Sequence, residues 1–213
     1  AEYVGLYREA IATLAKKKGT DKNLLLRLRA RLGDALESRL KDFDGALAVF
    51  EEILKAHPKD SAAAVAAIRV AGKGGRWADS ARIFVAFAAR RKEIDPALVA
   101  AVESSAESEP HWVAITTALS KEIPELPGAQ KLLVRDLESQ VAAWHRDKRS
   151  DLEAAEAAYG RALACDPEDR GILSALSMLQ RRARGRPLVE TLRRLSRTTG
   201  GDLGLLQEAG DIA

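Results

Sequence analysis

The chain has 213 residues, of which 46% are hydrophobic, 31% charged and 5% aromatic, and its formal net charge is +3. This apolar share excludes an intrinsically disordered chain, and the apolar runs are too short for the roughly 20 residues that cross a bilayer. Because Cys165 is the only cysteine, an internal disulfide is also excluded.

Helical spacing of apolar residues begins near the start of the chain, where Leu6, Ala10 and Leu14 share one stripe, and it continues to the end. The alternation that is typical of strands is not found. Asp42 is placed to cap a helix, and Pro96 stands at a first helical position, where its missing N–H costs nothing. We predict an all-α protein with about twelve helices, at residues 2–17, 23–40, 43–56, 61–72, 77–92, 97–106, 111–122, 128–147, 151–165, 169–184, 187–198 and 202–211.

An internal repeat is the strongest pattern in the chain. A large apolar residue is followed by a small one, then by an aromatic ring one turn later and by a further residue that faces the same side. The small residue allows two helices to approach closely, and the ring fills the gap beside it. The pattern recurs after 34 and after 109 residues, at Phe43, Ala46, Phe50 and Ile53, at Trp77, Ser80, Phe84 and Phe87, and at Leu152, Ala155, Tyr159 and Ala162.

The chain therefore resembles the tetratricopeptide repeat family, whose unit is a helix-turn-helix of 34 residues. Ala155, Tyr159, Ala162 and Pro167 match the signature of the family's second helix fully, and Leu32-Gly33 matches a pair in its first helix. The resemblance implies an α-solenoid of antiparallel helix pairs that wind into a right-handed superhelix. It is specific in two or three units and loose in the others, and a related helical-pair solenoid would satisfy the same pattern.

The spacing of the repeat divides the chain into consecutive units within a single domain. Neither end resembles a domain terminus, so we expect a fragment of a longer protein. The expected units are 1–22 as the end of a preceding repeat, full repeats at 23–60, 61–95, 96–125, 126–168 and 169–200, and 201–213 as the start of another.

No pattern in the sequence indicates catalysis, and we predict a protein that is not an enzyme and needs no cofactor. His57, His111 and His145 are far apart and lack the spacing of metal ligands, so no metal site is expected. Cys165 ends a predicted helix, where the helix dipole disfavours a thiolate. The glycine-rich turn 72–76 lacks the spacing of a phosphate-binding loop.

The resemblance implies a role in protein–protein interaction, with first helices lining a concave groove. A groove that is partly cationic and partly apolar suits an extended or helical segment of a partner protein. The carboxylate clamp of the family's chaperone-binding branch is not expected, because its positions carry no Asn here. The expected partner-binding residues are Arg27, Arg31, Asp34, Val65, Arg69, Asp136, Gln140, Ser177 and Arg181.

An arginine-rich stretch at 181–197 leaves two further functions open. It holds seven arginines and one acidic residue, Glu190, so the positive charge of the chain is concentrated there. Such a stretch could bind an acidic partner, an anionic membrane or nucleic acid, although it has no aromatic residue on which a base could stack. Self-assembly through exposed ends of the solenoid is a third possibility. The compartment stays open, with the cytoplasm favoured.

Overall fold

The computed structural model describes residues 2–17 and 21–213, and within these ranges the protein contains twelve α-helices and no strand. The all-α class and the repeated helix pairs predicted from the sequence are confirmed. The chain divides into two compact units, with unit 1 at residues 1–122 and unit 2 at residues 123–213.

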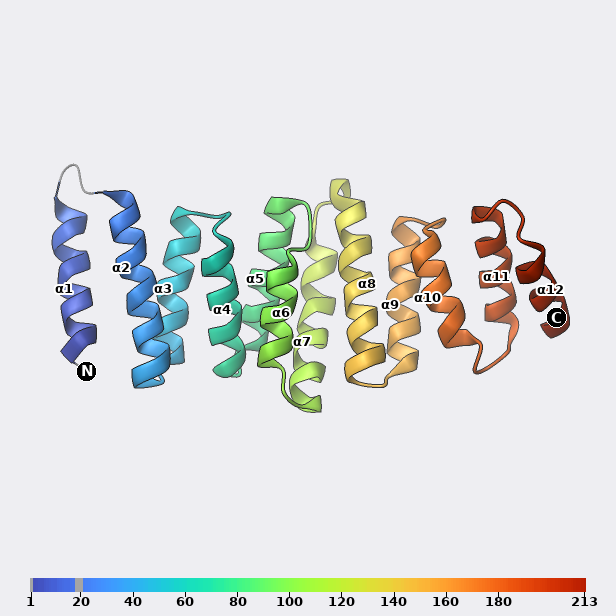
Figure 1. The fold of residues 1–213 in the computed structure, drawn as a ribbon, viewed down its shortest axis with the longest axis horizontal. Coiled ribbons are helices and arrows are strands. Elements are labelled where there is room, and N and C mark those ends of the chain that lie inside the picture. Colours follow the sequence, from blue (N-terminus) through green and yellow to red (C-terminus); the bar gives the residue numbers. More distant parts are fainter. Residues whose placement is uncertain (1, 18–20) are drawn as a thin grey trace. The chain divides into compact units, whose positions relative to one another are not determined.

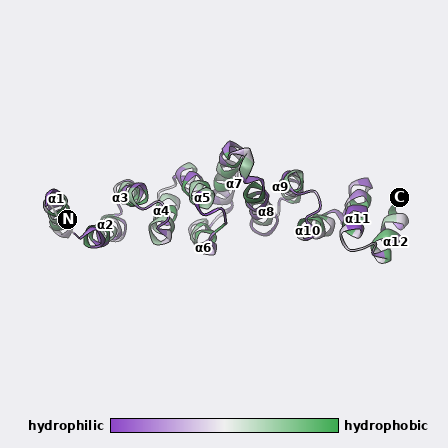
Figure 2. Ribbon diagram, turned by 90° about the horizontal axis from the view of Figure 1, so that it is seen from above, coloured by the Kyte–Doolittle hydropathy of each residue, from purple (hydrophilic) through white to green (hydrophobic). Residues whose placement is uncertain are grey.

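Unit 1 is a two-layered stack of seven helices. Figure 2 shows α2, α4 and α6 on one side of this unit and α3, α5 and α7 on the other. Successive helices from α1 to α5 pack as neighbours, whereas α6 packs chiefly on α4 and α7 chiefly on α5. The helices are α1 (Glu2–Lys16), α2 (Lys22–Ala35) with a π-helical last turn η1 (Leu36–Leu40), α3 (Phe43–Ala56), α4 (Ser61–Lys73), α5 (Trp77–Arg91), α6 (Pro96–Ser105) and α7 (Glu109–Glu122).

Within unit 2, successive helices from α8 to α12 run alternately up and down, and Figure 1 shows them side by side in chain order. The packed neighbours are α8 with α9, α9 with α10, α10 with α11 and α11 with α12. The elements are two short 3-10 turns η2 (Ile123–Glu125) and η3 (Gly128–Gln130), then α8 (Lys131–Lys148), α9 (Leu152–Cys165), α10 (Arg170–Gln180), α11 (Arg186–Thr198) and α12 (Leu203–Ile212).

The repeat positions identified in the sequence occupy equivalent buried places in their helices. The small residues Ala46, Ser80 and Ala155 are each 0% exposed. The rings that follow them, at Phe50, Phe84 and Tyr159, are at most 3% exposed. Each ring is therefore buried at the same place in its helix, as the spacing predicted.

Aspartate side chains begin most of the helices. Asp42 Oδ1 accepts a hydrogen bond from the Gly45 N–H at 2.8 Å, and Asp95 caps α6 in front of Pro96. The same arrangement recurs at the starts of α2, α4, α9, α10 and α12. Each cap accepts a hydrogen bond from a backbone N–H group that the start of a helix leaves without a partner, so a helix can begin directly after a short turn.

The helix expected at 128–147 begins only at Lys131, after the 3-10 turn η3, and the end of a second predicted helix is also wrong. The helix expected at 169–184 ends at Gln180, because residues 181–185 form a turn in which Arg184 adopts a positive φ of 44°. The backbone N–H groups of Ala183 and Arg184 both donate to the Gln180 carbonyl, which closes this turn. The chain thereby reverses before Pro187 enters α11.

Candidate functional site

Two neighbouring cavities lie beside α2 in unit 1. Arg31 and Asp34 line a cavity of about 310 Å³ between α1 and α2, with Tyr3 and Tyr7 on the α1 side. Asp34 and Arg69 line a second cavity of about 530 Å³ between α2 and α4. We call the residues that line the two cavities the Asp34 surface: Tyr3, Tyr7, Arg31, Asp34, Ala35, Glu37, Ser38, Arg39, Lys41, Phe43, Arg69 and Lys73.

The structure thus brings together three of the residues expected in unit 1, namely Arg31, Asp34 and Arg69. Arg27 is exposed on α2 and Val65 is half-buried on α4, and neither lines these two cavities. Arg27 lies one helical turn before Arg31, and Val65 one turn before Arg69, on the same faces of their helices, so both are displaced along the helix axis from the two cavities.

A buried carboxylate organises the cavity between α2 and α4. The side chain of Glu37 is 9% exposed, and its two oxygens accept hydrogen bonds from Arg69 Nη2 at 2.6 Å and from Lys73 Nζ at 2.8 Å. Arg69 Nε donates a further bond at 3.1 Å. Asp34 lies 3.8 Å from the same guanidinium. This cluster joins the last turn of α2 to α4 and fixes the direction of Arg69.

The pKa of Glu37 reflects two opposed effects. Burial raises the pKa, since it disfavours the charged form, but the hydrogen bonds and positive charges of Lys73 and Arg69 outweigh it, so the pKa lies below its usual value. Glu37 is therefore ionised at neutral pH. Its negative charge is already paired with Arg69 and Lys73, so Glu37 is not available to bind a ligand.

The Asp34 surface retains a positive excess after these contacts. It carries five cationic side chains and two carboxylates. Arg39 lies 5.5 Å from the centre of the Tyr3 ring, a cation–π distance. In the part of the chain that the structure describes, Arg31 has no ion-pair partner. A cation between two tyrosines and an aspartate can bind a peptide carboxylate or backbone carbonyl.

Two of the residues expected to bind a partner in unit 2, Asp136 and Arg181, form ion pairs within the chain. Asp136 and Gln140 are half-buried on α8, and Asp136 accepts a hydrogen bond from Arg135 Nε at 2.9 Å. Arg181 donates two bonds to the carboxylate of Glu208 on α12, at 2.8 and 2.9 Å. Its guanidinium therefore links α10 to α12.

The expectation that Ser177 faces a groove is not met. Ser177 is 1% exposed, and its Oγ donates to the Ser174 carbonyl at 2.8 Å. The residue belongs to the buried stripe of α10, together with Leu173, Leu176 and Gln180. The sequence register assigned to this helix was therefore wrong at this position.

The arginine-rich stretch is divided between a turn and the outer face of α11. Arg186 lies 3.5 Å from Glu190, and Arg194 Nη2 donates to the Pro167 carbonyl at 2.5 Å. Arg182, Arg184, Arg193 and Arg197 are exposed. The stretch is thus partly used in contacts within the chain, and binding of nucleic acid or another anion there stays a prediction.

No other centre of chemistry is found within residues 2–17 and 21–213. No group of histidine, cysteine and carboxylate side chains is arranged to hold a metal ion there. Cys165 is half-buried at the end of α9. None of the helices in these ranges combines the length and apolar character of a membrane span.

Sequence reasoning missed Glu37, Lys73 and the two tyrosines of α1. A signal for the cluster was present, because the acidic pair Asp34 and Glu37 is followed about one repeat later by the basic pair Arg69 and Lys73. Opposite charges with matching spacing on consecutive first helices predict ion pairs between them. The tyrosines had no such signal.

Comparison with known proteins gives only remote similarity. No family model and no curated protein matches the chain. Two solved crystal structures of MamA are similar to it. One is 15% identical and covers 88% of this chain and 91% of its own, with a TM-score of 0.36. The other is 17% identical and covers 84% of this chain and 93% of its own, with a TM-score of 0.35.

Proposed function

We propose that this protein is an interaction scaffold of tetratricopeptide-like helical repeats, and that unit 1 binds a segment of a partner protein on the Asp34 surface. The observation that carries the proposal is the pair of adjoining cavities that share Asp34 and Ser38. They are formed by side chains from consecutive helices, so they continue from one repeat to the next. A partner segment that crosses α2 would contact both.

The rigidity of the side chains that line the Asp34 surface supports a role in binding. Arg69 and Lys73 are held by the buried Glu37, and α2 and α4 are joined through them. A ligand therefore meets side chains that are already ordered, which lowers the entropy lost on binding. The tyrosines of the first cavity can contact apolar side chains at low entropic cost.

The proposal is tested by selecting ligands from a random peptide library displayed on phage with the intact chain, then measuring their dissociation constants. Arg31→Glu is the decisive variant, since Arg31 is exposed and has no ion-pair partner in the described residues. We expect affinity for the selected peptides to fall about tenfold, because a rim cation becomes a repelling carboxylate.

Lys121→Glu is the matched control. Lys121 is exposed in the last turn of α7, lies in the same unit and undergoes the same change of charge. It should leave the affinity unchanged. Equal losses from both variants would show that net charge alone governs binding, and a library that yields no ligand dependent on Arg31 would also refute the Asp34 surface. Light scattering at two protein concentrations checks the competing function of self-assembly.

A further inference from the structure

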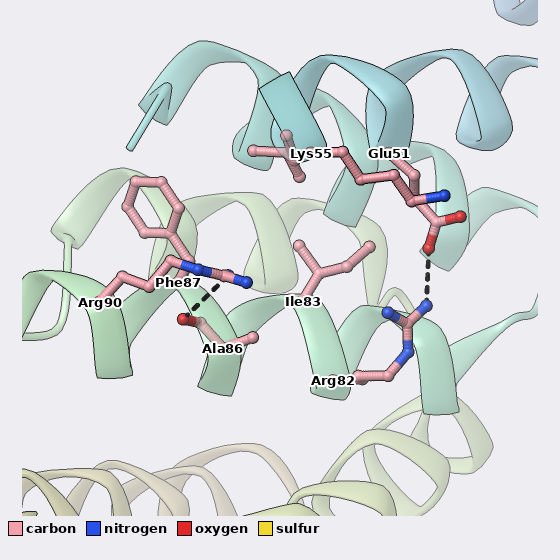
Figure 3. Close-up of a pocket in the computed structure, with 8 residues that line it drawn as sticks. Glu51, Lys55, Arg82, Ile83, Ala86, Phe87 and Arg90 are labelled. Atoms are coloured by element: carbon pink, nitrogen blue, oxygen red, sulfur yellow. Dashed lines mark hydrogen bonds and ion pairs between the residues drawn. The ribbon is translucent and has the colours of Figure 1, made fainter. Parts of the chain in front are cut away.

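A second cavity system lies on the opposite layer of unit 1, between α3 and α5. Its volume is about 360 Å³. Figure 3 shows Ile83 and Phe87 of α5 lying between the two helices, with Glu51 and Lys55 on the α3 side. Leu54 and Ala86 complete an apolar floor. We call this cavity the α3–α5 groove.

The two ends of the α3–α5 groove differ in charge. At one end, Arg82 Nη2 donates to Glu51 at 2.6 Å and to Asp79 at 2.8 Å, so the guanidinium is neutralised. Arg90 stands at the other end, and Lys55 lies on the α3 side, where Figure 3 shows its amine directed toward the end that holds Glu51. Arg90 Nη1 donates to the Ala86 carbonyl at 3.2 Å, and no carboxylate pairs with either cation within the described residues.

The cationic end continues into an open hollow of about 660 Å³ at the turn between α3 and α4. Arg90 lines both cavities, and Lys59 lines the hollow. The one carboxylate of the hollow, Asp60, already accepts the Ala63 N–H at 3.0 Å as the cap of α4. Lys55, Lys59 and Arg90 therefore lie along the two cavities with no ion-pair partner in the described residues.

From this arrangement we propose that the α3–α5 groove binds an acidic amphipathic peptide segment of another protein. An apolar side chain of the segment rests on Leu54 and Ala86, the half-buried residues of the floor, and its carboxylates meet Lys55 and Arg90. Charge complementarity selects the acidic partner. A nucleic acid fits less well, because Glu51 and Asp79 stand at the far end of the groove and the floor offers no exposed ring for stacking.

The test uses a fluorescein-labelled helical peptide with leucines on one face and glutamates on the other. Its binding to the intact chain is followed by fluorescence polarisation. We expect saturable binding that weakens about tenfold in the double variant Lys55→Glu/Arg90→Glu, because two attractive contacts become repulsive. Both residues are exposed, and circular dichroism checks that the variant stays folded.

Two altered peptides test the two halves of the contact separately. Replacing the glutamates by glutamines, or the leucines by serines, should each weaken binding about tenfold. The variant Arg31→Glu should bind the original peptide as the unaltered chain does, which separates this groove from the Asp34 surface.

Four results would overturn the proposal. They are equal affinity of the double variant, equal affinity of either altered peptide, loss of binding caused by Arg31→Glu, and equally tight competition by a single-stranded oligonucleotide. The last would indicate a general anion surface. Concentration-dependent dimerisation that Lys55→Glu/Arg90→Glu abolishes would identify a second copy as the occupant and would likewise overturn it.

Discussion

Gly33 of α2 lies so close to the ring of Phe50 on α3 that a Cβ atom on Gly33 would stand 2.6 Å from the ring's Cζ. The equivalent pairs, Ala67 with Phe84 and Ala142 with Tyr159, have the same sequence separation, and both alanines are 0% exposed. The small residue and the ring together define how closely the two helices of a pair approach.

The contact predicts that Gly33→Ala destabilises the protein. Overpacking a core costs about 1–3 kcal/mol, whereas replacing glycine by alanine inside a helix gains about 1 kcal/mol. Because the Phe50 ring is 2% exposed and closely surrounded, we expect overpacking to prevail by about 1 kcal/mol. Urea unfolding followed by circular dichroism measures the change.

Gly160→Ala is the control for this substitution. Gly160 is exposed within α9, and a Cβ there would meet no atom within 4 Å. It should gain about 0.5–1 kcal/mol from helix propensity alone. If Gly33→Ala were stabilising to the same degree, the close approach to Phe50 would be disproved.

At Ser80, which occupies the same place in its helix as Ala46 and Ala155, a substitution to alanine should stabilise the protein. The Ser80 Oγ is buried, and the described part of the chain offers it no hydrogen-bond partner, while Ala46 and Ala155 occupy the equivalent places. Ser80→Ala should therefore stabilise the protein by about 1 kcal/mol, since a buried hydroxyl without a partner costs about 1–3 kcal/mol. The reciprocal Ala46→Ser should destabilise it. Thermal unfolding of both variants tests the pair, and a loss of stability in Ser80→Ala would contradict it.

Glu37→Gln should destabilise the protein at neutral pH, because it leaves Arg69 and Lys73 without their shared anion. We expect about 1–2 kcal/mol, less than the roughly 3–5 kcal/mol of a fully buried pair, since both cations are partly solvated. The measurement is urea unfolding of the variant beside the unaltered chain.

The difference in stability between Glu37→Gln and the unaltered chain should also depend on pH. The pKa of Glu37 is lowered on folding, so its contribution is complete above the pKa of an unfolded glutamate, about 4.3, and is lost as the pH falls through the folded value. The difference in stability between the two proteins should therefore shrink below about pH 4.3. A difference that is constant from pH 7 to acid would exclude an ionised Glu37 as its source.

His145 predicts a second pH effect, in a higher range. It is buried in α8, where burial and then the positive charge of Arg149 lower its pKa. Arg149 Nη1 lies 2.7 Å from His145 Nδ1, and because arginine only donates, this ring nitrogen accepts and the imidazole is neutral. Stability should be complete above about pH 6.5, the pKa of an unfolded histidine, and should fall as the pH drops below it.

Melting temperatures between pH 7.5 and 5.5 check this, with His145→Asn compared with the unaltered chain. The variant should lose the part of the pH dependence that arises from His145. His57→Asn, at an exposed histidine in the turn after α3, is the matched removal of one histidine. An unchanged pH profile in His145→Asn would refute the assignment.

The positions of the helices and their buried faces could be predicted from the sequence alone, because both follow from local rules. The period of 3.6 residues, the aspartate caps and the prolines act within a few residues of the chain. The recurrence of Phe50, Phe84 and Tyr159 then identified which residues share one role. The end of α10 could not be predicted from these rules. The turn that follows it depends on a positive φ at Arg184, and an arginine in the sequence gives no sign of that conformation.

The binding surfaces depend on contacts between helices, which no local rule supplies. Whether Arg69 faces a ligand or Glu37 is decided by the rotation of α2 against α4, and the burial of Ser177 by the rotation of α10. The α3–α5 groove exists because two second helices leave a gap that Ile83 and Phe87 do not fill completely. Packing sets these rotations and gaps, since a helix turns until its apolar stripe meets the stripes of its neighbours.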